Sequence, residues 1–282
     1  MTALDTHLQM DAALQTALCM PDMEVNLREG QIIAPILLYH FVGRAALEWD
    51  GASTTRYNVT ADDFDAQLAL LHRLGYQTVT VGEIAAALRG ESVLPERPIA
   101  ITLDDGWIEQ YSIALPLLQK YGMRATFYIL SSYTRGERYV TWEQLEALRD
   151  AGMEIGSHTR THVNLTAISE EEASHEIFGS KSALEAKLGI TVESLAYPFG
   201  LYSDSTVALT RQAGYRAAVA LGPSPQQGLA NLYALRRVEI LGTDSLHNFI
   251  NRLPWRGQGT ALCPAEPADA RIEESANGRI GE

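Results

Sequence analysis

Residues able to bind a metal ion or transfer a proton follow short apolar runs at four places in the chain. They are His40, the pair Asp104 and Asp105, the pair His158 and His162, and the segment 197–200, which has the sequence Tyr-Pro-Phe-Gly. Imidazole and carboxylate groups are common zinc ligands and common general acids and bases. If the fold brings these four places together, the residues predict metal-assisted hydrolysis.

His158 and His162 are four positions apart. If the chain makes a helical turn there, both imidazoles lie on one face and can hold one cation. The same spacing also occurs in surface pairs that bind nothing. A carboxylate from another strand would complete three protein ligands and leave a position for water, as in catalytic zinc sites. Asp104 and Asp105 are the candidates for that carboxylate.

Neighbouring aspartates in a regular strand point to opposite faces. Because Gly106 follows Asp104 and Asp105, the backbone can turn and bring both side chains inward. One of them then binds the metal, and the other stays free beside the bound water. The alternative is that the segment 104–106 only forms a turn and a helix cap, for which Asp and Gly are both favoured.

The composition limits the classes of protein to consider. The chain has 282 residues, of which 46% are hydrophobic and 20% charged. Such a chain can bury a large core, which excludes a wholly disordered, collagen-like or disulfide-dominated protein. The net charge of −13 argues against nucleic acid as a partner, because binding to phosphates requires a basic surface. No apolar run reaches about 18 residues, so no transmembrane segment is predicted.

Apolar runs that predict buried strands alternate with segments that predict helices. The predicted strands are 32–38, 77–81, 99–103, 125–130, 153–155, 194–197, 217–220 and 237–241. Thr60, Thr141 and Ser169 are expected to cap the helices that follow them. Because strand and helix alternate, parallel strands are predicted. No glycine-rich nucleotide motif is present, so we expect a distorted α/β barrel of about seven parallel strands, whose carboxyl ends face the active site.

The chain divides into three predicted parts. They are an N-terminal helical extension at 1–30, a single catalytic barrel domain at 31–255, and a flexible tail at 256–282 that is rich in Pro, Ala, Glu and Gly. The extension lacks the pattern of a secretory signal. Cys19 and Cys263 lie in the two terminal parts, and the sequence leaves open whether they form a disulfide.

Three motifs occur in an order that resembles one known family. They are Thr-Leu-Asp-Asp-Gly at 102–106, His-Thr-Arg-Thr-His at 158–162 and Tyr-Pro-Phe-Gly at 197–200, with Ala-Thr-Phe-Tyr-Ile at 125–129 between the first two. This pattern resembles the NodB-type polysaccharide deacetylases of carbohydrate esterase family 4. The resemblance extends from about Pro35 to Leu253.

The resemblance implies a role for each motif. In that family the first aspartate of the pair is the catalytic base and the second is a metal ligand. This implies that Asp104 is the base and that Asp105, His158 and His162 hold a divalent ion. The implied ion is Zn²⁺, with Co²⁺, Ni²⁺ or Fe²⁺ as alternatives that suit the same ligands.

Two further catalytic groups are implied. The Pro-Phe step resembles the family motif whose backbone N–H stabilises the oxyanion, which assigns that role to Phe199. The catalytic histidine of the family often lies in a Leu-x-His near the C-terminus, whereas here Leu38-Tyr39-His40 fits on the first strand. Such an early position of His40 resembles the circularly permuted branch, which includes deacetylases of β-1,6-linked poly-N-acetylglucosamine.

The chain departs from the family pattern at two points. Ala196 stands where many members have an arginine that contacts the catalytic aspartate. Arg237 is the predicted replacement, with Arg236 and Arg160 as further candidates. The tryptophan motif that lines the acetyl pocket of the family is also not found, and Trp107 and Leu241 are the candidates for that wall.

The resemblance implies a hydrolase of non-peptide carbon–nitrogen bonds that releases acetate from polysaccharide containing N-acetylglucosamine. It also implies action in the cell envelope or outside the cell. Three alternatives stay open: an O-acetyl esterase of the xylan type, a carbohydrate-binding relative with weak or no turnover, and a non-haem iron oxygenase, because two His and one carboxylate also form its metal site. The polymer, its linkage and the oligomeric state are not predicted.

Overall fold

The barrel predicted from the sequence is present and closed. The computed structural model describes residues 12–44, 56–258, 260, 262 and 263. Within them, seven parallel strands form a ring, and the pairing of β2 with β6 closes it. In ring order they are β2 (Ile36–Tyr39), β12 (Leu235–Glu239), β10 (Ala217–Leu221), β9 (Ser194–Ala196), β8 (Glu154–Ser157), β7 (Thr126–Ile129) and β6 (Pro98–Leu103). Short β5 (Gln77–Thr78) pairs with β6 outside the ring. The predicted distorted barrel of about seven parallel strands is therefore confirmed.

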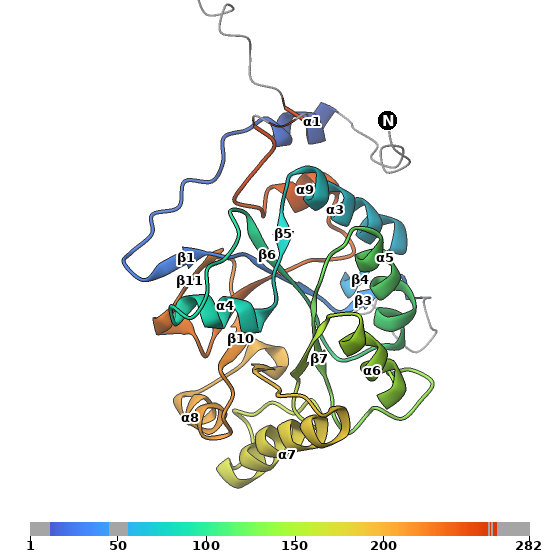
Figure 1. Ribbon diagram of the computed structural model, residues 1–282, viewed down its shortest axis with the longest axis vertical. Coiled ribbons are helices and arrows are strands. Elements are labelled where there is room, and N and C mark those ends of the chain that lie inside the picture. The colour runs from blue at the N-terminus through green and yellow to red at the C-terminus, as the bar shows by residue number, and fades with distance from the viewer. Residues whose placement is uncertain (1–11, 45–55, 259, 261, 264–282) are drawn as a thin grey trace, which may run out of the picture.

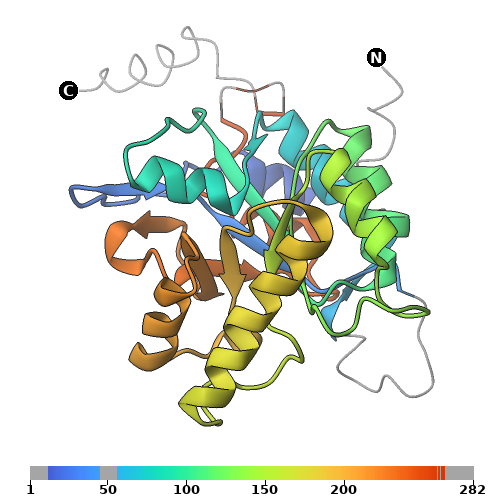
Figure 2. The same ribbon diagram turned by 60° about the horizontal axis from the view of Figure 1, so that its bottom comes forward.

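Helices surround the ring, as Figures 1 and 2 show. They are α1 (Ala12–Leu18), α3 (Ala61–Arg73), α4 (Val81–Leu88), α5 (Leu115–Lys120), α6 (Trp142–Asp150), α7 (Glu170–Leu188), α8 (Asp204–Gln212) and α9 (Leu246–Ile250). The three predicted caps are confirmed, because Thr60, Thr141 and Ser169 each accept a hydrogen bond from the backbone N–H three residues later. Short helical turns are η2 (Gln110–Ala114), η3 (Pro198–Gly200) and η4 (Leu229–Asn231).

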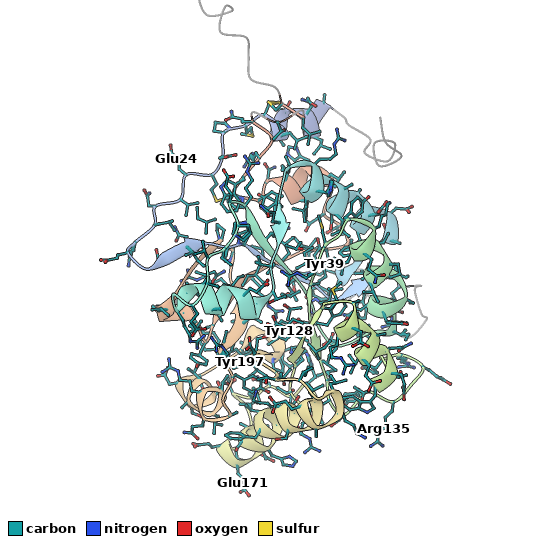
Figure 3. All side chains as sticks on the ribbon, in the orientation of Figure 1. Glu24, Tyr39, Tyr128, Arg135, Glu171 and Tyr197 are labelled. Carbon is teal, nitrogen blue, oxygen red and sulfur yellow. A yellow bond between two sulfur atoms is a disulfide. The ribbon has the colours of Figure 1, made fainter. Side chains whose placement is uncertain are left out.

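The alternation of side chains along the strands gives the barrel an apolar base and a polar top. Ile36, Ala100, Tyr128, Val219 and Leu235 form one buried cluster together with residues of α4. Tyr128, labelled in Figure 3, belongs to this cluster and is fully buried. Every second residue of a strand points to the same face. The inward positions nearer the carboxyl ends of the strands carry polar residues, and these line the top of the barrel.

The first predicted strand, 32–38, is two strands in the structure. β1 (Gln31–Ile33) pairs antiparallel with β11 (Gln226–Gly228) outside the barrel, and β2 begins only at Ile36. Pro35 lies at the break. Proline has no N–H to donate to a strand ladder, which explains why one apolar run divides there. A further small sheet joins β3 (Phe41–Val42) to β4 (Asn58–Val59).

The two terminal segments pack together at one end of the molecule, where Figure 1 shows α1 beside α9. Cys19 forms a disulfide with Cys263, so the pairing that the sequence left open is present. Gly257 N also donates to Leu18 O. Gly257 and Cys263 are therefore attached to Leu18 and Cys19. Residues 264–282 lie outside the described residues, so the flexible tail at 256–282 stays a prediction.

Reduction of this disulfide should destabilise the protein without affecting the barrel top. The bond joins positions 244 residues apart, and removal of a disulfide typically costs about 2–4 kcal/mol because the unfolded chain gains freedom. We expect a reductant to lower the melting temperature, while the folded protein keeps its metal affinity. The double variant Cys19→Ser, Cys263→Ser is the control, and its melting temperature should not respond to reductant.

None of the described helices is long and apolar enough to cross a membrane.

Candidate active site

Three side chains from two strand ends converge at the top of the barrel. Asp105 follows β6, and His158 and His162 follow β8. Asp105 Oδ1 lies 3.5 Å from His158 Nε2 and 3.5 Å from His162 Nε2. One ligand atom from each residue falls within 4.8 Å of the other two. These are the residues predicted to hold a metal, and one ion can contact all three with modest adjustment of the side chains.

The backbone at these positions has unusual dihedral angles. Among the described residues, the non-glycine residues with positive φ are Asp105 (76°), Thr159 (69°), His162 (62°) and Phe199 (60°), and all four belong to the predicted motifs. Such conformations cost of order 1–3 kcal/mol each and persist only where the surrounding structure enforces them. The backbone of these motifs is therefore strained.

The two motifs differ in how well the sequence predicted their conformation. The turn expected at 104–106 is present, because Asp105 and Gly106 both have positive φ and both aspartates point inward. The helical turn expected between His158 and His162 is absent, because residues 158–162 form a loop. The imidazoles meet there through the left-handed residues Thr159 and His162, a path that the His spacing alone does not specify.

Buried neighbours favour the neutral form of His158, which is the form that can bind a metal. Its Nδ1 lies 2.8 Å from Ala196 O, so a proton on Nδ1 leaves the lone pair of Nε2 facing Asp105. Burial lowers the pKa of His158 and outweighs the opposite effects of Asp104 and Asp105. Ala196, at the position compared above with the family arginine, thus contacts His158 through its backbone carbonyl.

Asp105 has a free oxygen that suits a metal. Trp107 Nε1 donates to its Oδ2 at 2.9 Å, whereas its Oδ1 is buried without a hydrogen-bond partner among the described residues. A buried, unpaired carboxylate oxygen is costly. One oxygen and two imidazole nitrogens form a donor set typical of catalytic zinc, so the residues present fit the implied ion.

Asp104 is held by Arg237, as the sequence analysis anticipated. Arg237 Nη1 donates to Asp104 Oδ1 at 2.6 Å and Nη2 to Oδ2 at 2.8 Å. Both residues are 2% exposed. Burial alone raises the pKa of Asp104, but Arg237, through its charge and its hydrogen bonds, overcomes this and lowers the pKa to about 2. Asp104 is therefore a fixed carboxylate at any physiological pH.

One pocket of about 360 Å³ contains all of these groups. His40 and Phe199, both predicted, line it together with Asp104, Asp105, His158, His162 and Arg237. Nδ1 of His40 is buried and has no hydrogen-bond partner among the described residues. Phe199 is 57% exposed and its ring meets that of His162 edge-on at 4.6 Å. The predicted site residues are thus neighbours in space.

Several residues that line the pocket were missed by the sequence analysis. Leu221 and Glu239 are two of them. Glu239 lies two positions after Arg237 on β12, so the alternation of that strand was a usable signal. Trp107 and Leu241, the candidates for the acetyl-pocket wall, are not among the lining residues. Trp107 hydrogen-bonds Asp105 instead, and Leu38, Tyr197 and Leu221 supply apolar wall.

Comparisons with known proteins identify the family to which the chain belongs. The model of the family described as polysaccharide deacetylase matches residues 91–218. The Bacillus subtilis (strain 168) protein YxkH is named as a polysaccharide deacetylase. It is 30% identical to this chain over 206 residues, which cover 73% of this chain and 71% of YxkH. A poly-β-1,6-N-acetyl-D-glucosamine N-deacetylase of Staphylococcus aureus (strain MRSA252) is 23% identical over 215 residues, covering 71% and 73%.

A solved structure supports the same assignment. The Streptococcus pyogenes deacetylase PplD, solved in complex with acetate, superposes with a TM-score of 0.72 at 27% identity and covers 79% of this chain and 98% of its own. Fold, motif order and sequence identity point the same way. The chain belongs to the polysaccharide deacetylase family, the NodB-type carbohydrate esterases of family 4.

Proposed function

We propose that the protein removes acetyl groups from a polysaccharide that contains N-acetylglucosamine, in a reaction that requires a divalent metal ion. The observation that carries this proposal is the convergence of Asp105, His158 and His162 beside the Asp104–Arg237 pair in one pocket. Such a site offers three side chains that can hold a metal ion and a separate carboxylate that can accept a proton from water, as metal-assisted hydrolysis requires.

Each residue has one proposed task in amide hydrolysis. Asp105, His158 and His162 would hold the ion, which when bound would lower the pKa of water and polarise the acetyl carbonyl. Asp104 accepts the proton of the attacking water, and Arg237 keeps that carboxylate charged and oriented. As the C–N bond breaks, His40 donates a proton to the departing nitrogen. The backbone N–H of Phe199 donates to the oxyanion of the tetrahedral intermediate.

The relatives guide the choice of substrate. The S. aureus relative is named for poly-β-1,6-N-acetyl-D-glucosamine, and the S. pyogenes relative was solved with acetate, the expected product. We therefore propose an N-acetylated, β-1,6-linked glucosamine chain as substrate and a role in the cell envelope or outside the cell. Zn²⁺ is the proposed ion, because its usual ligands match the donor set.

Acetate release with and without a chelator tests this proposal. The substrates are β-1,6-linked N-acetylglucosamine oligomers, chitooligosaccharides and acetylated xylan. We expect release from the β-1,6-linked oligomers, and chelation should reduce the rate more than about 100-fold, since water without the ion has a pKa of 15.7 rather than about 7. Added Zn²⁺ should restore the rate.

The other outcomes have definite meanings. A full rate after the protein has been stripped of metal would refute metal dependence. Release from xylan alone would identify an O-acetyl esterase, and sugar binding without release would identify a carbohydrate-binding relative. Consumption of oxygen with ferrous iron would instead indicate an oxygenase.

A further inference from the structure

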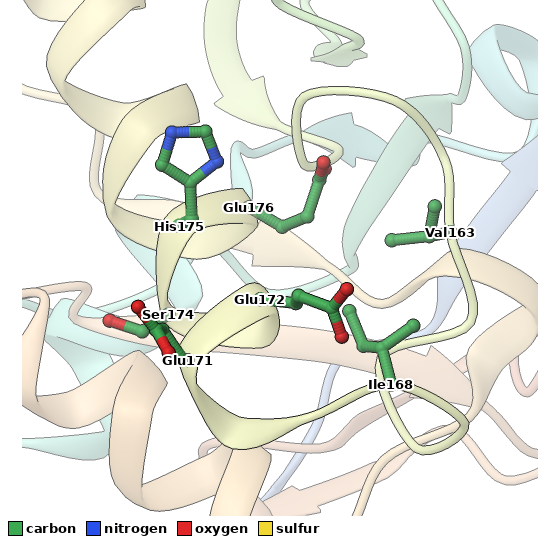
Figure 4. Close-up of a pocket in the computed structure, with 7 residues that line it drawn as sticks. All are labelled: Val163, Ile168, Glu171, Glu172, Ser174, His175 and Glu176. Carbon is green, nitrogen blue, oxygen red and sulfur yellow. The ribbon is translucent and has the colours of Figure 1, made fainter.

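Helix α7 contacts the loop that carries the two proposed histidine ligands, 158–162. Glu176 of α7 accepts two backbone hydrogen bonds through Oε2, from Arg160 N at 2.8 Å and from Thr161 N at 2.9 Å. Its Oε1 accepts a third from Thr161 Oγ1 at 2.8 Å. Figure 4 shows the side chain of Glu176 leaving the helix towards the loop that carries Val163. One carboxylate thus binds the middle of the loop.

Two further residues on the same helix face make contact with the loop or with the end of β8. Arg160 packs so closely on Gly179 that a Cβ there would lie 2.8 Å from its Cδ, and Ser157 Oγ donates to Ser180 Oγ at 2.8 Å. Glu176, Gly179 and Ser180 are spaced three and four residues apart, which places them on one face of α7. The helix therefore contacts the loop through a continuous surface.

The hydrogen bonds of Glu176 fall between the two strained residues. Thr159 and His162 have positive φ, and Arg160 and Thr161 lie between them. Both intervening N–H groups point to one carboxylate, an arrangement in which successive amides bind an anion. A β-branched residue such as Thr159 strongly disfavours positive φ, so the loop needs an external partner to keep this conformation.

Glu176 is suited to hold the loop because its carboxylate has no competing cation among the described residues. It is 8% exposed, and no cation pairs with it among the described residues. Loop donors alone therefore compensate for the burial of its charge, and hydrogen bonds to a buried carboxylate are stronger than neutral ones. A pocket of about 550 Å³ lies beside it, lined by Val163, Ile168 and the first turns of α7 (Figure 4). The loop therefore borders open space at Val163, while Ser131 N and Ser132 N hold its other side through Thr159 O and Arg160 O.

We propose that Glu176 is a positioning residue of the metal site, which holds the strained loop so that His162 stays within reach of the ion shared with Asp105 and His158. Glu176 itself touches neither the ion nor the substrate. The inference rests on the proposed metal site and adds the residue that fixes its geometry. Groups that orient metal ligands commonly change metal affinity by about 10–100-fold when they are removed.

Zinc affinity of Glu176 variants tests the proposal without any substrate. The dissociation constant is measured by competition with a chromogenic chelator on folded protein. We expect Glu176→Ala to raise it about 10–100-fold. Glu176→Gln should raise it by less, because its amide oxygen still accepts from both N–H groups but binds them more weakly than a carboxylate does. Glu171→Ala is the matched control on the same helix, since Glu171 is exposed, and it should change nothing.

Catalysis at saturating zinc gives a second readout. With the site refilled, Glu176→Ala should regain most of its kcat with an unchanged KM, because the catalytic groups themselves are intact. If Glu176→Ala does not fold, Glu176→Asp replaces it. Its shorter side chain keeps the charge but cannot reach both amides, so its zinc dissociation constant should rise several-fold.

Two results would overturn the inference, and they are distinguishable. Wild-type zinc affinity in folded Glu176→Ala, or in Glu176→Asp if the alanine variant does not fold, refutes the role of Glu176 and leaves the metal site standing. A wild-type protein that binds no zinc, cobalt or nickel refutes both the site and the role assigned to Glu176.

Discussion

Replacing Asp104 by Asn should lower kcat for acetate release by about 10²–10⁴-fold, the usual contribution of a general base. Asn keeps the shape of the side chain and one acceptor for Arg237, but it cannot take a proton from water. Asp104 is not one of the three proposed metal ligands, and its Oδ2 lies 3.8 Å from His158 Nε2. The zinc content of Asp104→Asn should therefore match that of the wild type.

The neighbouring Asp105→Asn is the matched comparison for this prediction. It makes the same chemical change one residue later, at a proposed ligand whose Oδ1 faces both imidazoles. We expect Asp105→Asn to lose zinc affinity and to recover activity partly when zinc is in excess, whereas zinc should not rescue Asp104→Asn. A folded Asp104→Asn that keeps the wild-type rate would remove the proposed base.

Much of the site could be predicted because strand order and side-chain alternation are local properties of the sequence. The apolar runs before Asp104 and His158 marked two strand ends, and barrel closure then brings those ends together. Arg237 was proposed differently, as a replacement for the arginine missing at Ala196 and at the start of the predicted strand 237–241, whereas the structure places it inside β12. The helix caps followed from the same kind of short-range pattern.

The parts that could not be predicted depend on contacts between distant segments. The positive φ of Thr159 has no signal in its own side chain, because it is enforced by neighbours such as Glu176, which is 17 residues away in the sequence. The Cys19–Cys263 bond depends on how two terminal segments pack. The division of the first strand at Pro35 is different, because it could have been predicted: a proline has no N–H to donate within a strand ladder, and Pro35 is visible in the sequence.

Replacing Arg237 by Met should destabilise the folded protein by about 3–5 kcal/mol at neutral pH, the usual effect of removing one partner from a buried ion pair. The buried carboxylate of Asp104 then loses both the positive charge of Arg237 and the two hydrogen bonds that Arg237 donates. Thermal or urea unfolding of chelator-treated protein measures the loss. The control is Lys120→Met, which removes the cation of a partly exposed pair with Asp65 and should cost no more than about 1 kcal/mol.

The pH dependence and a double variant identify the cause of that loss. In the wild type the pKa of Asp104 is lowered to about 2, so its stabilising effect is present above the unfolded value of 3.8 and is lost as the pH falls towards 2. Without Arg237, burial would raise the pKa, and protonation in mild acid would relieve the buried charge. The difference in unfolding free energy between wild type and Arg237→Met should thus shrink as the pH falls.

The double variant Asp104→Asn, Arg237→Met should be destabilised by less than the two single effects combined, because it leaves neither charge unpaired. Additive losses that are constant with pH would instead indicate that Arg237 supports the barrel only through packing.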